Sequence, residues 1–178
     1  MRSICVFCGA SAGHDPAYAA AAGALGSGLA ARSIELVTGG GKVGLMAVVA
    51  DAALEAGGRV TGIIPRGLEE REVAHRGLTR LHVVETLHER KALMHELSDA
   101  FIVLPGGFGT LDELFETITW AQLGIHAKPI GLVNVSGYFD DLLAFVAGAV
   151  AQGFVSGANR GLLVVRDDVP TLLDALLL

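Results

Sequence analysis

Cysteines, basic clusters and long apolar runs are scarce in this sequence, and each shortage excludes a class of protein. Only two cysteines occur among the 178 residues, so no second pair is present to complete a zinc site. The formal net charge is −6 and no basic cluster exceeds two adjacent residues, which argues against duplex nucleic acid and anionic membrane as partners. No apolar run approaches the roughly 20 residues that a membrane span needs.

The N-terminus is typical of a first strand rather than of a signal peptide. Residues Met1–Cys8 contain neither a long apolar stretch nor a cleavage site, and we therefore expect a cytoplasmic protein. Cys5 and Cys8 form a C-x-x-C pattern, which is found in redox pairs and in half zinc sites. Within a strand, however, an odd separation directs two side chains to opposite faces, so we interpret both cysteines as core residues.

The composition indicates one folded domain that spans residues 1–178. Apolar residues make up 52% of the chain and charged residues 18%, which argues strongly against disorder. A chain of this length is sufficient for one domain with a sizeable core.

Strand-like and helix-like patterns alternate along the whole chain. We expect strands at 3–8, 34–38, 60–64, 81–84, 101–104, 130–134 and 162–165. We expect helices at 15–31, 43–56, 88–97, 110–123, 139–152 and 170–177, the first of them capped by Asp15 and Pro16. The strands are continuously apolar, which is typical of burial on both faces. The sequence therefore predicts the α/β class: a doubly wound, Rossmann-like parallel sheet flanked by helices.

Three glycine clusters fall where predicted strands end, at residues 9–11, 39–41 and 106–109. In this fold class ligands bind outside the carboxyl ends of the strands, so we expect the three clusters to converge on one ligand. The cluster at 106–109 leads directly into a predicted helix. Glycines let a ligand approach the backbone, and a helix N-terminus presents free N–H groups and a positive dipole end. This stretch predicts a phosphate cradle.

Two other phosphate-binding motifs fit less well. Residues 39–44 match G-x-G-x-x-G, the dinucleotide fingerprint, but that motif normally follows the first strand. It also requires an acidic residue about 20 positions later, where this chain reads Ile63-Ile64-Pro65-Arg66. A Walker A loop is excluded because Lys42 is followed by Val43 rather than by Ser or Thr.

Charged side chains near the glycine clusters are candidates for ligand binding and for acid–base catalysis. Arg90 follows the fourth predicted strand at the same sheet edge, and a planar guanidinium suits bidentate contacts to phosphate or ribose. Of Asp112, Glu113 and Glu116, Glu113 is closest in register to the glycine loop and is our candidate for acid–base work. The six histidines show no metal-ligand spacing, and we expect neither a metal nor a cofactor.

Four sequence segments together resemble the LOG ("Lonely Guy") family of cytokinin-activating phosphoribohydrolases. They are residues 39–46, 89–91 with Met94, 98–113 and 119–126, and the most specific element is P-G-G-x-G-T-x-x-E paired with an upstream R-K. The resemblance covers residues 5 to about 154. Ala10 and Ala47 depart mildly from the family pattern, as does Lys42, whose extra charge bears on substrate preference.

The resemblance implies hydrolysis of an N6-substituted adenosine 5′-monophosphate to the free base and ribose 5-phosphate, without metal or cofactor. It assigns Arg90 and Glu113 as the catalytic pair. The other site residues that it implies are Gly107, Phe108, Gly109, Thr110, Gly40, Gly41 and Thr119 for the phosphate, Lys91 and Glu72 along the site, and Met46 and Met94 beside the base. It also implies a homodimer whose active site can draw residues from the partner. The apolar segment 117–123, which carries Trp120, is where we expect the two copies to meet.

Two alternatives to this function remain at this stage. The chain could be a non-catalytic nucleotide-binding or molybdenum-cofactor-binding protein on the same fold, although Arg90 and Glu113 argue against it. It could also be a general AMP nucleosidase, which differs only in the base. Many LOG-like proteins were once labelled lysine decarboxylases. The sequence gives that label no support, because it has only three lysines and nothing that resembles a pyridoxal-phosphate site.

Overall fold

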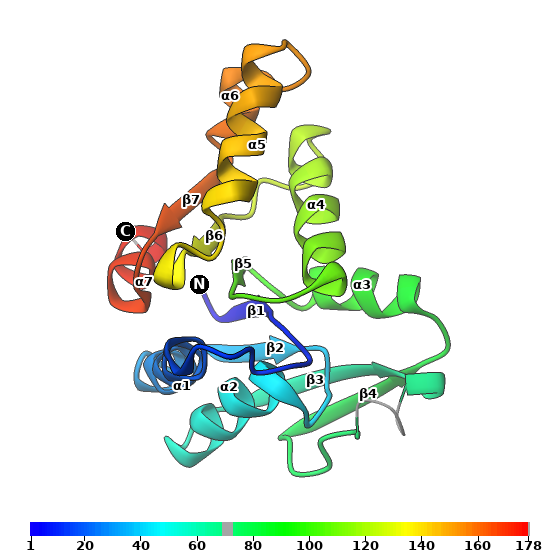
Figure 1. Ribbon diagram of the computed structural model, residues 1–178. Coiled ribbons are helices and arrows are strands. Elements are labelled where there is room, and N and C mark those ends of the chain that lie inside the picture. The colour runs from blue at the N-terminus through cyan, green and yellow to red at the C-terminus, as the bar shows by residue number, and fades with distance from the viewer. Residues whose placement is uncertain (69–72, 178) are drawn as a thin grey trace.

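The computed structural model describes residues 1–68 and 73–177, which form a seven-stranded parallel sheet with helices on both faces (Figure 1). The strands are β1 (Ser3–Phe7), β2 (Glu35–Thr38), β3 (Val60–Pro65), β4 (Arg80–Val84), β5 (Ala100–Val103), β6 (Ile130–Val133) and β7 (Leu163–Arg166). Their order across the sheet is β4-β3-β2-β1-β5-β6-β7, and every neighbouring pair is parallel. The predicted doubly wound α/β fold is therefore confirmed.

The α-helices lie where the sequence predicts them, with one short addition. They are α1 (Pro16–Ala31), α2 (Gly44–Glu55), α3 (Leu87–Glu96), α4 (Phe108–Gln122), α5 (Asp140–Ala151), α6 (Gly157–Arg160) and α7 (Val169–Leu177). The predicted cap of α1 is confirmed, because the Asp15 carboxylate accepts a hydrogen bond from the Ala17 amide at 2.9 Å. The addition is α6, a single turn capped by Ser156 that the sequence pattern does not predict. No helix in the described part of the chain is long and apolar enough to cross a membrane.

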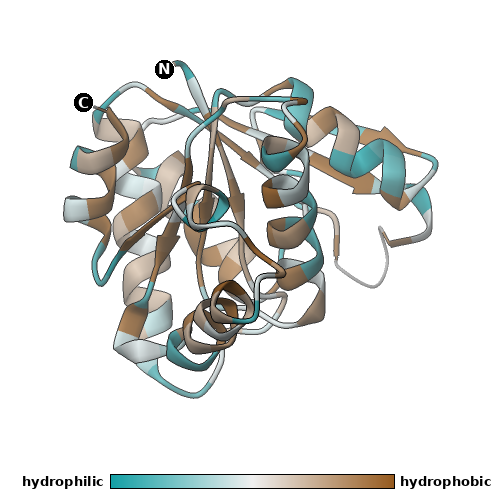
Figure 2. Cartoon of the chain, turned by 90° about the horizontal axis from the view of Figure 1, so that it is seen from above, coloured by the Kyte–Doolittle hydropathy of each residue, from teal (hydrophilic) through white to brown (hydrophobic). Residues whose placement is uncertain are grey.

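The sheet is the centre of the core, and its central strands are mostly brown, the hydrophobic end of the scale, in Figure 2. Helices α1, α2 and α7 pack on one face, where Leu25, Val49 and Leu172 are buried. Helices α3 and α4 pack on the other face, where Met94 and Leu114 are buried. As the strand geometry predicts, the two cysteines belong to different faces: Cys8 lies in the α1 and α2 core and Cys5 in the α3 and α4 core.

The edge strand β4 differs from expectation. Its sequence is apolar enough to predict burial on both faces, yet it is mostly exposed, and the Val83 side chain is 41% exposed. Within the described part of the connection from β3 to β4, residues Arg66–Leu68 form only a 3-10 turn, η1. The described part of this connection contains no α-helix that could cover β4. The apolar sequence pattern of the strand therefore overestimates its burial.

The chain reverses direction across the sheet between β1 and β5. It first runs outward from β1 to β4 and then returns to place β5 on the other side of β1, with Phe7 paired to Val103. The loops that leave these two strands lead to α1 and α4 on opposite faces of the sheet. Folds of this class bind ligands at such a point, at the carboxyl ends of the strands.

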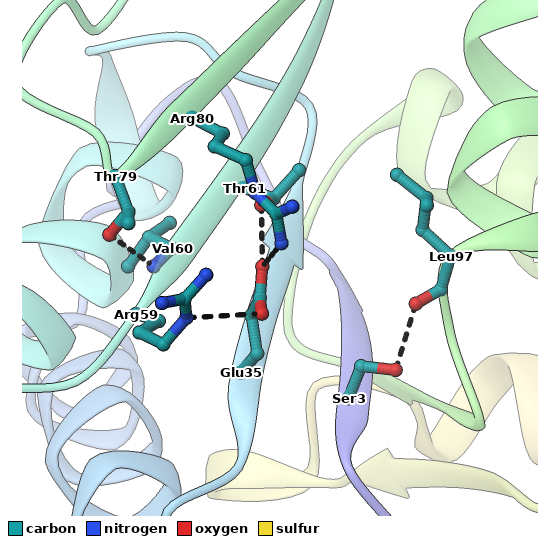
Figure 3. Close-up of polar contacts among 8 residues, drawn as sticks. All are labelled: Ser3, Glu35, Arg59, Val60, Thr61, Thr79, Arg80 and Leu97. Atoms are coloured by element: carbon teal, nitrogen blue, oxygen red, sulfur yellow. Dashed lines mark hydrogen bonds and ion pairs between the residues drawn. The ribbon is translucent and has the colours of Figure 1, made fainter.

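The amino ends of the strands are joined by side-chain pairs (Figure 3). Glu35 at the start of β2 accepts hydrogen bonds from the Thr61 hydroxyl at 2.6 Å and from Arg80 Nη2 at 2.8 Å. Arg59 Nε lies 3.4 Å from the same carboxylate. On the neighbouring strand, the Ser3 hydroxyl donates to the carbonyl of Leu97 at 2.8 Å. These contacts connect β2, β3 and β4, and tie β1 to the segment before β5.

Candidate functional site

A cavity of about 550 Å³ opens at the carboxyl ends of the central strands. It is lined by residues 8–13 after β1, by Gly39 after β2 and by residues 105–110 after β5. The three glycine clusters singled out in the sequence therefore converge on one cavity, as the position of the strand ends predicts. The cavity sits at the β1/β5 reversal, where this class of fold binds its ligands.

The phosphate cradle, defined here as residues Gly106–Thr110, forms one wall of the cavity. Helix α4 begins with Gly107 as its N-cap, which has no side chain to bond the first-turn amides. Amides of an uncapped first turn are available to an anion, and the helix dipole adds a positive end. A Cβ at Gly106 would collide with the Thr110 side chain and lie 2.8 Å from the Gly9 nitrogen, so glycine is required there.

The loop after β1 is held against both of its neighbours by main-chain bonds. The Gly9 amide donates to the carbonyl of Pro105 at 3.0 Å, and the Gly9 carbonyl accepts from the Leu45 amide at 2.9 Å. Gly44 has a φ of 53°, and a Cβ on it would collide with the backbone of Ala10. The loops after β1 and β5 and the start of α2 therefore form one interlocked backbone unit.

Arg90 reaches the cavity from helix α3 and is held there by the loop after β2. Its residue exposure is only 6%, and its Nη2 donates to the carbonyl of Gly39 at 2.9 Å. Thr86 caps the helix by accepting from the Glu89 amide at 3.1 Å, which fixes the turn that carries Arg90. A Cβ on Gly39 would overlap the guanidinium, so this glycine provides the space that the arginine occupies.

The three carboxylates of α4 are separated by the structure. Glu113 lines the cavity. Asp112 and Glu116 instead bind Lys91, each with a carboxylate oxygen 3.0 Å from its Nζ. Burial lowers the pKa of Lys91, but hydrogen bonds to these two carboxylates outweigh it and raise the pKa above its ordinary value. Glu113 is therefore the carboxylate of the three that is placed to act on a ligand.

Cys8 contributes a neutral thiol to the cavity floor. Burial, and then the negative charge of Glu113, raise its pKa far above the ordinary value for cysteine. Burial also raises the pKa of Cys5, which lies on the other face of the sheet. A thiol that stays protonated is a poor nucleophile, so neither cysteine is suited to covalent catalysis.

The remaining walls of the cavity are apolar and aromatic. Met46 and Met94, which the family resemblance places beside the base, both line it and are almost completely buried. Tyr18 and Tyr138 also line it, and sequence reasoning missed both. Tyr138 follows β6 at the carboxyl edge of the sheet, so extending the strand-end rule to the sixth strand would have found it.

Two glycines assigned to the phosphate lie beside the cavity rather than along it. Gly40 has a φ of 76° and packs against β3, where a Cβ would come 3.1 Å from the Ile63 nitrogen. Gly41 pairs with Ala74 in an isolated bridge. In this structure Gly40 and Gly41 shape the loop that carries Gly39, and a direct phosphate contact from either stays a prediction.

Two further predicted residues, Lys91 and Thr119, do not line the cavity. Lys91 is engaged by its two carboxylate partners. The Thr119 hydroxyl donates to the carbonyl of Phe115 at 2.7 Å, and Thr119 lines a second cavity on the outer side of α4. Glu72 lies outside the described residues. Their roles at the site stay predictions, as does the absence of a metal; residues 1–68 and 73–177 hold no group of three or more histidine, cysteine, aspartate or glutamate side chains placed for one.

Comparison with known proteins identifies close sequence relatives. Residues 46–176 match the protein family described as "Possible lysine decarboxylase". The chain is 52% identical over 176 residues to a probable cytokinin riboside 5′-monophosphate phosphoribohydrolase, LOGL9, of Oryza sativa subsp. japonica, covering 99% of this chain and 78% of the relative. It is 49% identical to cytokinin riboside 5′-monophosphate phosphoribohydrolase LOG2 of Arabidopsis thaliana, covering 99% of this chain and 83% of the relative.

Solved structures with the same fold are more distant in sequence. The molybdenum cofactor carrier protein of Chlamydomonas reinhardtii superposes with a TM-score of 0.75 at 23% identity, over 99% of this chain and 98% of the carrier. The molybdenum cofactor binding protein of Rippkaea orientalis gives 0.72 at 24% identity, over 99% of this chain and 94% of the other. At these identities the similarity shows a shared fold alone.

Proposed function

Because this chain belongs to the family of the cytokinin riboside 5′-monophosphate phosphoribohydrolases, we propose that it hydrolyses the N-glycosidic bond of an adenosine 5′-monophosphate. The products are the free base and D-ribose 5-phosphate, and the preferred substrate carries a substituent on N6. The observation that supports this most directly is that Arg90, Glu113 and the phosphate cradle border one cavity.

The geometry suggests a division of labour for the reaction. The 5′-phosphate binds the first-turn amides of α4, and the base lies beside Met46 and Met94. Cleavage of the N-glycosidic bond passes through an oxocarbenium-like ribose, as in O-glycoside hydrolysis. Glu113 stabilises that cation or activates the attacking water, and Arg90 orients the ribose phosphate. Phosphate binding away from the reacting bond supplies positioning energy.

Lysine decarboxylation, the activity in the family description, finds no support in the cavity. None of the chain's three lysines lines it. Lys91 is bound by Asp112 and Glu116, and the Lys128 amine donates to the carbonyl of His95 at 2.5 Å. A Schiff-base mechanism requires a lysine amine at the reacting centre, which this site does not supply.

The principal alternative is a non-catalytic nucleotide or molybdenum-cofactor carrier. The carriers share the fold at under 25% identity, whereas the relatives named as hydrolases are about twice as similar in sequence. A general AMP nucleosidase is the second alternative, and only the base distinguishes it.

One assay separates these functions. The protein is incubated with adenosine, AMP and N6-isopentenyl-AMP, and the released base is quantified by chromatography. We expect both monophosphates to be cleaved far faster than adenosine, because the cradle requires a phosphate, and the prenylated nucleotide to be preferred. Equal turnover of adenosine and AMP would contradict the proposal, no base release would favour a carrier, and a preference for plain AMP would favour the nucleosidase.

We further propose that the protein is a homodimer joined through α4 and α5. Helix α5 is strongly apolar, yet none of its residues is buried within the single chain. Figure 1 shows it lying beside α4, and between these helices, α6 and β7 is a second cavity of about 550 Å³ with mainly apolar walls. Phe145 on α5 and Phe154 beyond it are 72% and 88% exposed. Exposed apolar surfaces of this kind mark interfaces, and a second copy of the chain can cover this one.

Light scattering tests the assembly. The wild-type protein is expected to have the mass of a dimer, and Phe145→Glu that of a monomer, because a buried charge opposes association. Leu177→Glu, on the opposite face of the sheet, is the control and should remain dimeric. A wild-type monomer at micromolar concentration would contradict the proposal. The cytoplasmic location and the single-domain organisation expected from the sequence stay predictions.

A further inference from the structure

The turn after β6 has an unusual backbone. Residues Val135–Gly137 form a 3-10 turn, η2, in which Ser136 has a φ of 52° and Gly137 a φ of 70°. Positive φ is uncommon for a residue with a Cβ, and such residues cluster where the surrounding structure imposes a conformation for function. Two consecutive left-handed residues between a buried strand and the start of α5 raise the question of what this turn holds in place.

Asn134 holds the turn closed through both ends of its amide. Its Oδ1 accepts from the Phe139 amide at 2.8 Å, and its Nδ2 donates to Asp140 Oδ1 at 2.7 Å. Asn134 is 8% exposed and Phe139 is 2% exposed, so the turn is anchored in the core on both sides. The residue between these anchors, Tyr138, consequently has a fixed direction.

Tyr138 is directed at the phosphate cradle. Its hydroxyl donates to the carbonyl of Gly106 at 2.6 Å. Its ring packs edge-to-face on Tyr18 of α1, with the ring centroids 5.5 Å apart, and both rings line the cavity. The side chain therefore links the turn after β6 to the loop after β5, two segments that no sequence motif connects.

The Gly106 carbonyl matters because it belongs to the peptide unit between two glycines. A peptide is planar and trans, so its carbonyl and its N–H point in opposite directions, and holding the Gly106 oxygen also orients the Gly107 N–H. Neither glycine has a Cβ to restrict the rotation of this peptide, so its orientation depends on contacts such as the Tyr138 hydrogen bond. Gly107 is the N-cap of α4 and lines the cavity.

We propose that Tyr138 is the positioning residue of the phosphate cradle: its hydroxyl fixes the Gly106–Gly107 peptide so that the Gly107 amide is oriented for the ligand's phosphate. This role rests on the proposed function for its ligand, a nucleoside 5′-monophosphate. Tyr138 acts through the backbone, so its removal weakens phosphate binding selectively and leaves recognition of the base intact.

The test compares two fragments of the proposed substrate by calorimetry. Tyr138→Phe removes the hydroxyl and keeps the ring, and its affinity for ribose 5-phosphate should fall by about 3- to 10-fold, the effect of one neutral hydrogen bond. Its affinity for adenine should be unchanged. Ser3→Ala is the matched control, because it also removes a hydroxyl that bonds a backbone carbonyl, at the opposite end of the sheet (Figure 3), and it should change neither affinity.

A second variant tests the turn itself. Asn134→Ala should show the same selective loss for ribose 5-phosphate, since it releases the turn that directs Tyr138. Steady-state kinetics with AMP should show a higher KM in Tyr138→Phe with kcat within about twofold, the pattern of lost uniform binding.

Three results would overturn the role: unchanged ribose 5-phosphate affinity in Tyr138→Phe, an equal loss for adenine, or no ribose 5-phosphate binding by the wild type. Failure of the proposed hydrolysis is distinguishable, because a protein that releases no base from AMP can still show the selective loss of ribose 5-phosphate affinity.

Discussion

The two ends of the sheet are built in opposite ways. At the amino ends, charged and hydroxyl side chains pair across strands, with Glu35 bonded to Thr61 and Arg80 (Figure 3). At the carboxyl ends, glycine loops meet through main-chain bonds such as Gly9 to Pro105, and they enclose a cavity. Side-chain pairs fill space and satisfy one another, whereas glycine loops leave backbone groups and volume available to a ligand.

We infer from this difference that stability and function are separable along the strand direction. A change at the carboxyl end should alter ligand binding or turnover more than unfolding, and a change at the amino end should do the reverse. Arg90 and Glu113 belong to the carboxyl end of the sheet. The helices that carry them, α3 and α4, also contribute Met94 and Leu114 to the core.

The largest effect on turnover is expected from Glu113→Gln, which keeps the shape of the side chain and removes its negative charge. Losing an acid–base contribution lowers turnover by roughly 10²–10⁴-fold. AMP binding should change by only a few-fold, because the phosphate cradle is untouched. Base release and calorimetry measure the two quantities. Glu116→Gln is the control, since Glu116 binds Lys91 outside the cavity, and near-normal turnover in Glu113→Gln alone would show that the catalytic carboxylate is misassigned.

A smaller loss of activity, measured as kcat/KM, is expected from Gly39→Ala. The added methyl group would overlap the Arg90 guanidinium, whose Cζ lies 2.9 Å from the ideal Cβ position. Arg90 must then move, and displacement of a positioning group by about 1 Å can lower kcat/KM by roughly 10²-fold. Kinetics with AMP check this. Gly23→Ala in α1 is the control, because beyond the backbone of its own helix no atom lies within 4 Å of its Cβ position, and alanine favours a helix interior. Equal kinetic constants for AMP in the two variants would contradict the placement of Arg90.

The smallest effect on activity, and a measurable one on stability, is expected from Glu35→Gln at the amino end. Removing the charge from this hydrogen-bonded carboxylate should lower the free energy of unfolding by about 1 kcal/mol at pH 7. Turnover should be unchanged. Urea denaturation and the base-release assay measure both, and a loss of turnover without a loss of stability would break the proposed separation of the two ends.

The pH dependence of that stability difference follows from the pKa of Glu35. Burial raises this pKa, but hydrogen bonds from Thr61 and Arg80 outweigh it, so the folded-state pKa lies below the ordinary 4.5. A carboxylate with a depressed folded pKa contributes stability that is fully present above its unfolded value and is lost as the pH falls through the folded one. The difference between wild type and Glu35→Gln should therefore disappear on acidification below about pH 4.5. A difference in the free energy of unfolding that grows as the pH falls would contradict this prediction.

Much of the fold and part of the site could be predicted from local sequence. Strand and helix patterns repeat along the chain, and each depends on residues close together, such as the Asp15–Pro16 start of α1. The convergence of the three glycine clusters on one cavity was predictable because parallel strands bring their carboxyl ends to one edge. Glu113 was distinguishable from its neighbours by its register on α4 alone.

Other features depended on which distant segments pack together. The exposure of β4 followed from its place at the sheet edge, which an apolar pattern does not encode. The binding of Lys91 to Asp112 and Glu116, and the position of Thr119 on an outer face, depended on how α3 and α4 pack. Local patterns carry no information on which side chains from separate helices come within bonding distance.

The order and type of the elements and the chemistry available at the strand ends follow from the amino-acid sequence alone, because both are set by neighbours along the chain. The hydrogen bond from Tyr138 to the cradle carbonyl of Gly106, 32 residues away, and the space that Gly39 leaves for Arg90 arise from tertiary packing. Hydrogen bonds and steric fit act over a few ångströms in space. Which residues come that close depends on the packing of the whole sheet and its helices.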